Sequence, residues 1–148
     1  MSSKRRGPAW EVPAAEYGRA LPAVTVNLLV HDIARSLRFY REVLGAEVRH
    51  HDEDFAALRL GAHDLMLHAD HAYERHPWAA ELARGGRRGL GAELRLLGPD
   101  ADAIEARARA YGAVILGAAA DKPHGWRETW VADPDGYVWA VGHRLGGP

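Results

Sequence analysis

Two charged residues near the middle of the chain could bind a ligand or transfer a proton. Glu93 and Arg95 are separated by one residue in "AELRLL" (92–97), so they share a face if this segment is a strand. Glu93, the candidate catalytic residue, could hydrogen-bond a ligand amine or act as a general base, while Arg95 could hold an anionic oxygen. The alternative is that the two side chains form an ion pair with each other.

Histidine and tryptophan supply the other side chains suited to binding. The chain has nine His and no Cys, which excludes disulfides, thiolate metal sites and cysteine nucleophiles. No two His form a close pair on a convincing helix, and His68 is interpreted as a hydrogen-bonding residue at a pocket edge. Trp126 follows Gly125 in "KPHGWRETW" (122–130), where an exposed ring could stack on a ligand. The alternative for Trp126 is packing, including at a dimer interface.

Composition places the chain among ordinary globular proteins. It has 148 residues and a formal net charge of −1, so no overall field favours nucleic acid as a partner. No apolar run approaches the roughly 20 residues that a membrane span needs. The basic start "MSSKRRGP" has no apolar stretch after it, which predicts no secretory signal. A cytoplasmic location fits best.

The order of the expected elements repeats once along the chain. In each half a strand precedes an amphipathic helix, with Asp32 or Asp100 as its N-cap and Gly45 or Gly112 at its end. Further strands follow each helix, so each half predicts a βαβββ module. The strand candidates are "VTVNLLV", "AEVRHH", "FAALRL", "DLMLH", "AELRLL", "WRETWVA" and "YVWAV".

The repeat divides the chain into four segments. These are an irregular N-terminal arm (1–22), a first module (23–70), a connector with a short helix in "PWAAELA" (71–91) and a second module (92–145). Trp10 is expected to pin the arm, which could cross to a partner subunit, and Trp78 is expected to anchor the connector helix. Trp130 and Trp139 are expected to form a cross-strand pair.

Two stretches carry a resemblance to a known family. Val30, Asp32, Ser36, Phe39 and Tyr40 form V-x-D-x-x-x-S-x-x-F-Y, and residues 133–137 read D-P-D-G-Y. With the paired modules, they make residues 23–145 resemble the vicinal oxygen chelate superfamily, which includes glyoxalase I, extradiol dioxygenases and the bleomycin-resistance proteins. The resemblance implies an α+β fold in which two βαβββ modules form a curled eight-stranded cup with helices on the convex side.

The same resemblance indicates where a metal would bind. Metal-dependent relatives place His or Glu at one cup-facing position on each of four strands, and the matching positions here are Thr25, Met66, Glu93 and Ala140. Only Glu93 is a good ligand for a hard divalent ion. We therefore expect no metal cofactor, although His68, Glu93 and His124 form a fallback set that could hold Fe, Mn, Ni or Zn.

The functional expectation follows the metal-free, bleomycin-resistance-like branch. Its members are mostly homodimers, and "KPHGWRETW" resembles the P-x-G-x-R-E segment near their ligand groove. We expect a metal-independent protein that sequesters an aromatic or cationic small molecule. The alternatives are a metal-dependent lyase, isomerase or dioxygenase, and a metal-free enzyme with Glu93 as base. The expected ligand-binding residues are Thr25, Asn27, Met66, His68, Glu93, Arg95, Trp126, Arg127 and Ala140.

Overall fold

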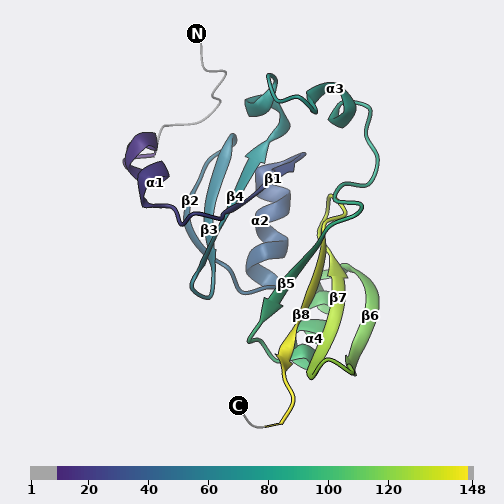
Figure 1. The fold of residues 1–148 in the computed structure, drawn as a ribbon. Helices are drawn as coiled ribbons and strands as arrows, with labels where there is room; N and C mark the ends of the chain where they lie inside the picture. Colours follow the sequence, from purple (N-terminus) through teal and green to yellow (C-terminus); the bar gives the residue numbers. More distant parts are fainter. Residues whose placement is uncertain (1–9, 147–148) are drawn as a thin grey trace. The chain divides into compact units, whose positions relative to one another are not determined.

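The computed structural model describes residues 10–146 (Figure 1). Its strands and its two longest helices follow one another in the order that the sequence repeat predicts. The elements are α1 (Ala14–Ala20), β1 (Val26–Val30), α2 (Ile33–Glu42), β2 (Glu47–His51), β3 (Phe55–Leu60), β4 (His63–Ala69), the 3-10 helix η1 (Asp70–Tyr73), α3 (Ala79–Leu82), β5 (Glu93–Leu97), α4 (Ala101–Tyr111), β6 (Val114–Asp121), β7 (Trp126–Ala132) and β8 (Val138–Arg144).

The strands form two four-stranded sheets of identical topology. The first has the order β1-β4-β3-β2 and the second the order β5-β8-β7-β6. In each sheet the first pair is parallel and the other two pairs are antiparallel. The predicted α+β class and its two βαβββ modules are therefore confirmed. Within residues 10–146, no helix has the length and apolar character of a membrane span.

The packing units differ from the sequence modules. Among the described residues, one unit contains 10–37 together with Ala46–Gly86, and the other contains Arg38–Gly45 together with 87–146. The division falls inside α2, which the sequence analysis assigned wholly to the first module. The limits at 23–70 and 92–145 therefore describe the repeat in sequence and not the packing.

In the first unit, the N-terminal segment is more regular than predicted. Residues 14–20, expected to be irregular, form helix α1, and its Tyr17 is buried. The Trp10 ring stacks on His50 of the same chain, with centroids 4.9 Å apart and planes 9° apart, so Trp10 does pin this segment. The expectation for Trp78 was wrong, because this side chain is 60% exposed and anchors no helix.

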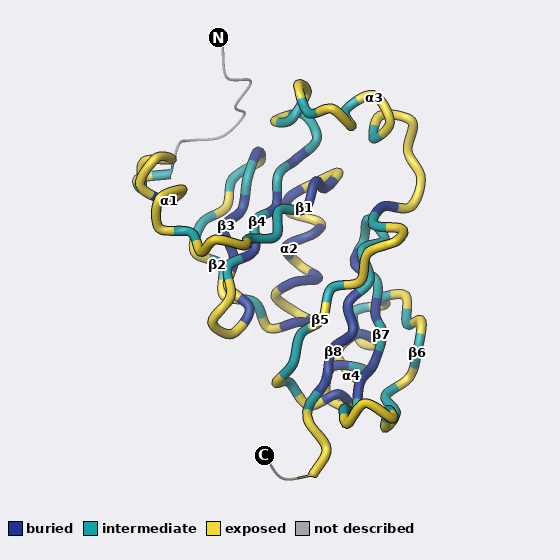
Figure 2. The backbone as a smooth tube through the Cα atoms, viewed as in Figure 1, coloured by how far each residue is buried: buried dark blue, intermediate teal, exposed yellow. Residues whose placement is uncertain are grey.

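In the second unit, helix α4 covers one face of the sheet (Figure 1). The Asp100 side chain accepts a hydrogen bond from the Ala103 amide, and Gly112 ends the helix with φ +87°. Both predicted end signals of α4 are confirmed. Buried residues, dark blue in Figure 2, run along β7 and β8, whereas α3 of the first unit has no buried residue.

The D-P-D-G-Y turn is stabilised by its first residue. The Asp133 carboxylate accepts hydrogen bonds from the amides of Asp135, Gly136 and Tyr137 through one oxygen. Its other oxygen accepts a 2.7 Å bond from the buried Tyr40 hydroxyl. The turn that joins β7 to β8 is thereby fixed to helix α2 within one packing unit.

Candidate functional site

The register of the second sheet decides which side chains can meet a ligand. Arg95 lies opposite Ala140, and Ala140 lies opposite Trp130, so these residues share one face. The alternate residues, including Trp139 and Val131, are buried on the side of α4. We call the face turned away from α4 the open face of the second sheet. Trp130 and Trp139 lie on opposite faces, so the expected cross-strand pair is wrong.

A charged cluster occupies this open face. Arg95 donates from Nη1 to Glu93 and from Nη2 to Glu128, the second bond measuring 2.6 Å. The Nε2 atom of His124 lies 3.2 Å from Arg95 Nη2 and 3.3 Å from Glu128 Oε2. We call Glu93, Arg95, His124 and Glu128 the Arg95 cluster. The ion pair that the sequence left as an alternative for Glu93 and Arg95 is therefore present.

Burial differs sharply among the members of the cluster. The side chains of Glu93 and Arg95 are 40% and 39% exposed, whereas that of Glu128 is 1% exposed. Burial acts to lower the pKa of Arg95, but its hydrogen bonds to Glu93 and Glu128 and their negative charges raise it overall. The guanidinium is thus a permanent cation that compensates a buried carboxylate.

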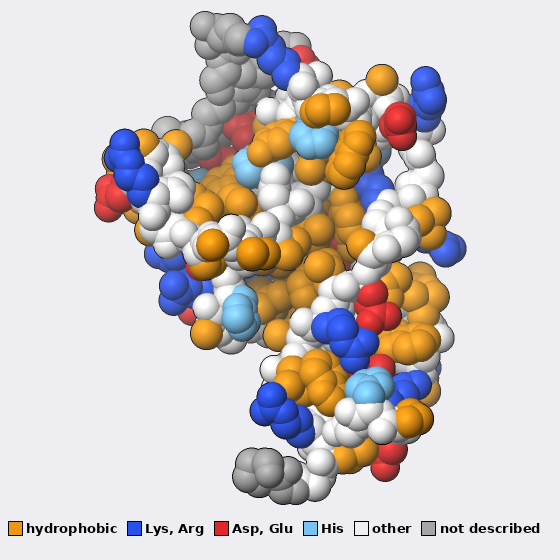
Figure 3. Space-filling model, in the orientation of Figure 1, with side chains coloured by type: hydrophobic (Ala, Val, Ile, Leu, Met, Phe, Trp, Pro, Cys, Tyr) orange, Lys and Arg blue, Asp and Glu red, His pale blue; other side chains and the backbone are white. Residues whose placement is uncertain are grey.

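Two tryptophans flank the cluster. The Arg95 guanidinium carbon lies 4.8 Å from the centroid of the Trp126 ring, and Lys122 Nζ lies 4.8 Å from that of Trp130. Trp130 Nε1 also donates a 3.1 Å hydrogen bond to Glu128. Figure 3 shows positive, negative and His side chains side by side among hydrophobic ones in the region that Figure 1 labels β5, β7 and β8. The open face therefore combines aromatic surface with paired charges.

The Arg95 cluster does not fit a divalent cation. Glu93 and His124, two members of the fallback set, both contact the Arg95 guanidinium, while His68 belongs to the first packing unit. Across residues 10–146, no three His, Asp or Glu side chains are grouped so as to hold a metal. Ala140 offers no donor atom. A side-chain cation thus lies where the acidic donors meet, and a metal would have to displace it.

The first sheet presents a different chemistry on the matching face. Asn27 lies opposite Met66, and His68 is the next residue of β4 on that face. The Asn27 Oδ1 atom lies 2.6 Å from His68 Nδ1, and its Nδ2 donates a 3.3 Å bond to the Tyr73 hydroxyl. Burial lowers the pKa of His68 from 6.5 to about 4, against a smaller raising effect of Asp52. His68 is therefore a neutral imidazole at physiological pH.

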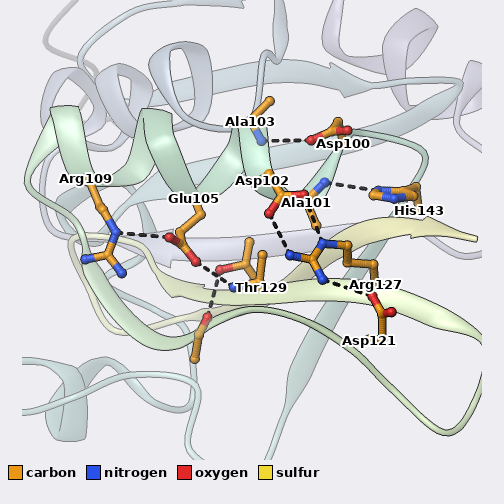
Figure 4. Close-up of polar contacts among 12 residues, drawn as sticks. Asp100, Ala101, Asp102, Ala103, Glu105, Arg109, Asp121, Arg127, Thr129 and His143 are labelled. Carbon is orange, nitrogen blue, oxygen red and sulfur yellow. Dashed lines mark hydrogen bonds and ion pairs between the residues drawn. The ribbon is translucent and has the colours of Figure 1, made fainter. Parts of the chain in front are cut away.

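Two of the expected ligand-binding residues lie apart from these groups. Thr25 precedes β1, and its hydroxyl donates to the Pro22 carbonyl at 3.2 Å. Arg127 lies on the α4 side of the second sheet, where it binds Asp102 and Asp121 (Figure 4). Strand alternation explains this, because Arg127 lies between Trp126 and Glu128, which belong to the open face.

The sequence analysis did not select Glu128, which belongs to the Arg95 cluster, or Lys122, which contacts Trp130 on the same face. Both stand in "KPHGWRETW", the stretch that was singled out for Trp126. Alternation from Trp126 reaches Glu128 and Trp130 at steps of two, so the strand period could have identified Glu128. Its partner Arg95 is 33 residues away in sequence, and no local pattern predicts that contact.

Comparisons with known proteins agree with this fold. A model of the Glyoxalase/Bleomycin resistance protein/Dioxygenase superfamily matches residues 23–141. No curated protein matches the sequence. A glyoxalase-related enzyme from Fulvimarina pelagi is 21% identical over 83% of this chain and 88% of its own, with a TM-score of 0.66.

Two further solved structures are similar to the same extent. A glyoxalase/bleomycin resistance protein/dioxygenase family enzyme from Burkholderia phytofirmans PsJN is 24% identical over 82% of this chain and 97% of its own, with a TM-score of 0.66. A lactoylglutathione lyase from Agrobacterium tumefaciens is 22% identical over 82% of this chain and 94% of its own, with a TM-score of 0.61. At these identities the similarity concerns the fold.

Proposed function

Because the chain belongs to the glyoxalase/bleomycin resistance protein/dioxygenase superfamily, we propose that it binds a small organic molecule without a metal. The ligand is a planar aromatic or cationic compound, which the protein sequesters on the open face of the second sheet. One observation carries the proposal: a guanidinium, and not a set of free donor atoms, lies between Glu93 and Glu128 beside Trp126. The expected homodimer and cytoplasmic location belong to the same proposal.

The contacts of Arg95 indicate which ligand chemistry this face accepts. Arg95 is a planar cation that contacts the Trp126 ring and two carboxylates at once. A planar ligand with a positive charge can make the same contacts, because a cation stacks on Trp126 and is attracted to Glu93 whether it belongs to a side chain or to a ligand. The partly exposed Arg95 side chain can turn aside while Glu128 keeps its bond from Trp130.

The geometry gives less support to the two enzymatic alternatives. A metal-dependent lyase, isomerase or dioxygenase would need Fe, Mn, Ni or Zn at donors that Arg95 now engages. A general base at position 93 would need a desolvated carboxylate, whereas Glu93 is 40% exposed and paired with Arg95. Neither alternative draws support from a specific contact.

The planar cationic dye proflavine tests the proposal. We expect saturable binding with one site per chain, measured by calorimetry, and the same affinity after removal of metals with a chelator. Trp126→Ala should weaken binding about fivefold, since stacking on one aromatic ring contributes about 1 kcal/mol. Trp78→Ala removes a Trp that lies outside the second sheet and is the control. A stoichiometric protein-bound metal that binding requires, or equal loss in both variants, would overturn the proposal.

A further inference from the structure

A strip of aromatic rings runs through the first packing unit. Each ring contacts the next; the ring centroids are 4.9 Å apart between Trp10 and His50 and 4.4 Å apart between His68 and Tyr73. All of these rings are partly exposed. We call this set the aromatic strip. In the order in which neighbouring rings touch, it consists of Trp10, His50, Phe55, His68, Tyr73 and His76.

Partly exposed rings in continuous contact differ from the scattered apolar residues of an ordinary surface. Phe55 lies at the centre of the strip, with His68 4.8 Å away on one side and His50 6.1 Å away on the other. Figure 3 shows His side chains among hydrophobic ones in the region that Figure 1 labels β1, β4 and α3. Such a surface suits the flat apolar face of a small molecule.

The hydrogen bonds of His68 define what it can offer to a ligand. Asn27 Oδ1 can only accept, so the 2.6 Å contact requires the proton of the neutral imidazole to be on Nδ1. Asn27 is itself oriented by its bond to the Tyr73 hydroxyl. The Nε2 atom of His68 is therefore a hydrogen-bond acceptor, and it has no partner among residues 10–146.

A second polar atom beside the strip is also unsatisfied. Tyr17 is 9% exposed, and its hydroxyl has no hydrogen-bond partner in the described part of the chain. Its ring contacts Phe55 at 5.8 Å and Trp10 at 5.1 Å, so Tyr17 adjoins the same rings. Buried polar groups without partners are uncommon in native proteins, and one explanation is a bound molecule that supplies the partner.

We propose that the aromatic strip binds a planar, uncharged ring that carries a hydroxyl or N–H group, and that this group donates to His68 Nε2. His68 thereby determines specificity for a donor-bearing ring, such as a phenol or an N–H heteroaromatic. The inference rests on the proposed binding of a small organic molecule and adds the chemical class recognised by the first unit. The aromatic strip would bind a neutral group of a ligand, whereas the Arg95 cluster would bind a charged one.

The chemistry of the strip favours this class over its alternatives. A neutral imidazole gives no charge to attract an anion, and its lone pair at Nε2 cannot bond to an ether or a carbonyl oxygen. A ligand without a donor would cover Nε2 and leave it unpaired. Leaving this acceptor unpaired costs about 1.4 kcal/mol, which corresponds to roughly tenfold discrimination.

A pair of probes that differ by one methyl group tests the inference on the full chain. We expect 2-naphthol to bind about tenfold more tightly than 2-methoxynaphthalene, as measured by fluorescence titration. His68→Asn retains an N–H close to the Nδ1 position but lacks the Nε2 acceptor, and it should abolish this preference. His51→Asn, an exposed His of the same unit, is the control and should keep the preference.

The outcomes separate this inference from the proposed function, because neither naphthalene probe carries a charge. Equal affinity for the two probes, tighter binding of the methoxy compound, no binding of either, or a preference that persists in His68→Asn would overturn it. If His68→Asn does not fold, ¹⁵N NMR of the imidazole in the unmodified protein decides. The expected result is a proton on Nδ1 and an upfield shift of Nε2 when 2-naphthol binds. A proton on Nε2, or no shift, would contradict the inference.

Discussion

The acid sensitivity of the fold should depend on one histidine. Burial holds the pKa of His68 at about 4 in the folded protein, against 6.5 when the side chain is in water. As the pH falls below 6.5, the unfolded chain therefore takes up a proton at this site before the folded chain does. The stabilisation that His68 provides is complete above pH 6.5, decreases as the pH falls, and is lost by pH 4.

The size of this effect follows from the two pKa values. A difference of this size corresponds to about 3 kcal/mol in the free energy of unfolding once the pH lies below both pKa values. Between pH 7 and pH 4.5 the expected loss is roughly 2 kcal/mol. That is a large fraction of the 5–15 kcal/mol that typically stabilises a domain.

The assay compares pH dependences and not absolute stabilities. Urea unfolding, followed by tryptophan fluorescence, gives the free energy of unfolding at a series of pH values for the unmodified protein and for His68→Asn. The carboxylates contribute equally to both curves, so their difference isolates His68. We expect the variant to lose roughly 2 kcal/mol less than the unmodified protein between pH 7 and pH 4.5. Parallel curves for the two proteins, or an equal change in the control His51→Asn, would refute the reasoning.

Three substitutions test the packing of the second unit, each by urea unfolding. Tyr40→Phe removes the buried bond to Asp133 and should cost about 2 kcal/mol; a loss below about 0.5 kcal/mol would mean that water replaces the hydroxyl. Arg95→Met leaves the buried Glu128 without its cation and should cost about 1–3 kcal/mol, a range already discounted for the exposure of Arg95. Gly142→Ala places a Cβ 1.8 Å from a backbone carbonyl oxygen of β7 and should cost more than about 3 kcal/mol, so near-native stability would contradict the β7–β8 register.

The elements of the fold were predictable because their signals are local. Asp100 and Gly112 delimit α4 through one side-chain bond and one left-handed residue, and both depend only on the neighbouring turn. Strand alternation likewise separates Ala140 from its neighbour Trp139, and the structure has these two residues on opposite faces of the sheet. These rules hold wherever a strand has one face covered by a helix.

The composition of the site was only partly predictable, for a related reason. Alternation can assign Arg95 and Glu128 to faces, but their bond joins β5 to β7 across β8, and register decides whether they meet. The prediction for Arg127 came from the resemblance to the P-x-G-x-R-E segment. It did not consider that Arg127, between Trp126 and Glu128, must point to the opposite face of the strand. The expectation that Trp78 anchors the connector helix failed because being aromatic does not by itself determine the burial of a single residue on a short connector.

The matching registers of the two sheets explain how one scaffold carries two chemistries. Asn27 lies opposite Met66 as Arg95 lies opposite Ala140, so Asn27 and Arg95 hold equivalent positions. The amide at the first position orients a neutral imidazole, whereas the guanidinium at the second binds two carboxylates. Exchanging only one of these residues would therefore not transfer the chemistry: Asn27→Arg would bring a cation to the aromatic strip, where desolvation disfavours the charge. The difference in chemistry resides in each residue together with its partners, and we expect the two faces to select different chemical groups.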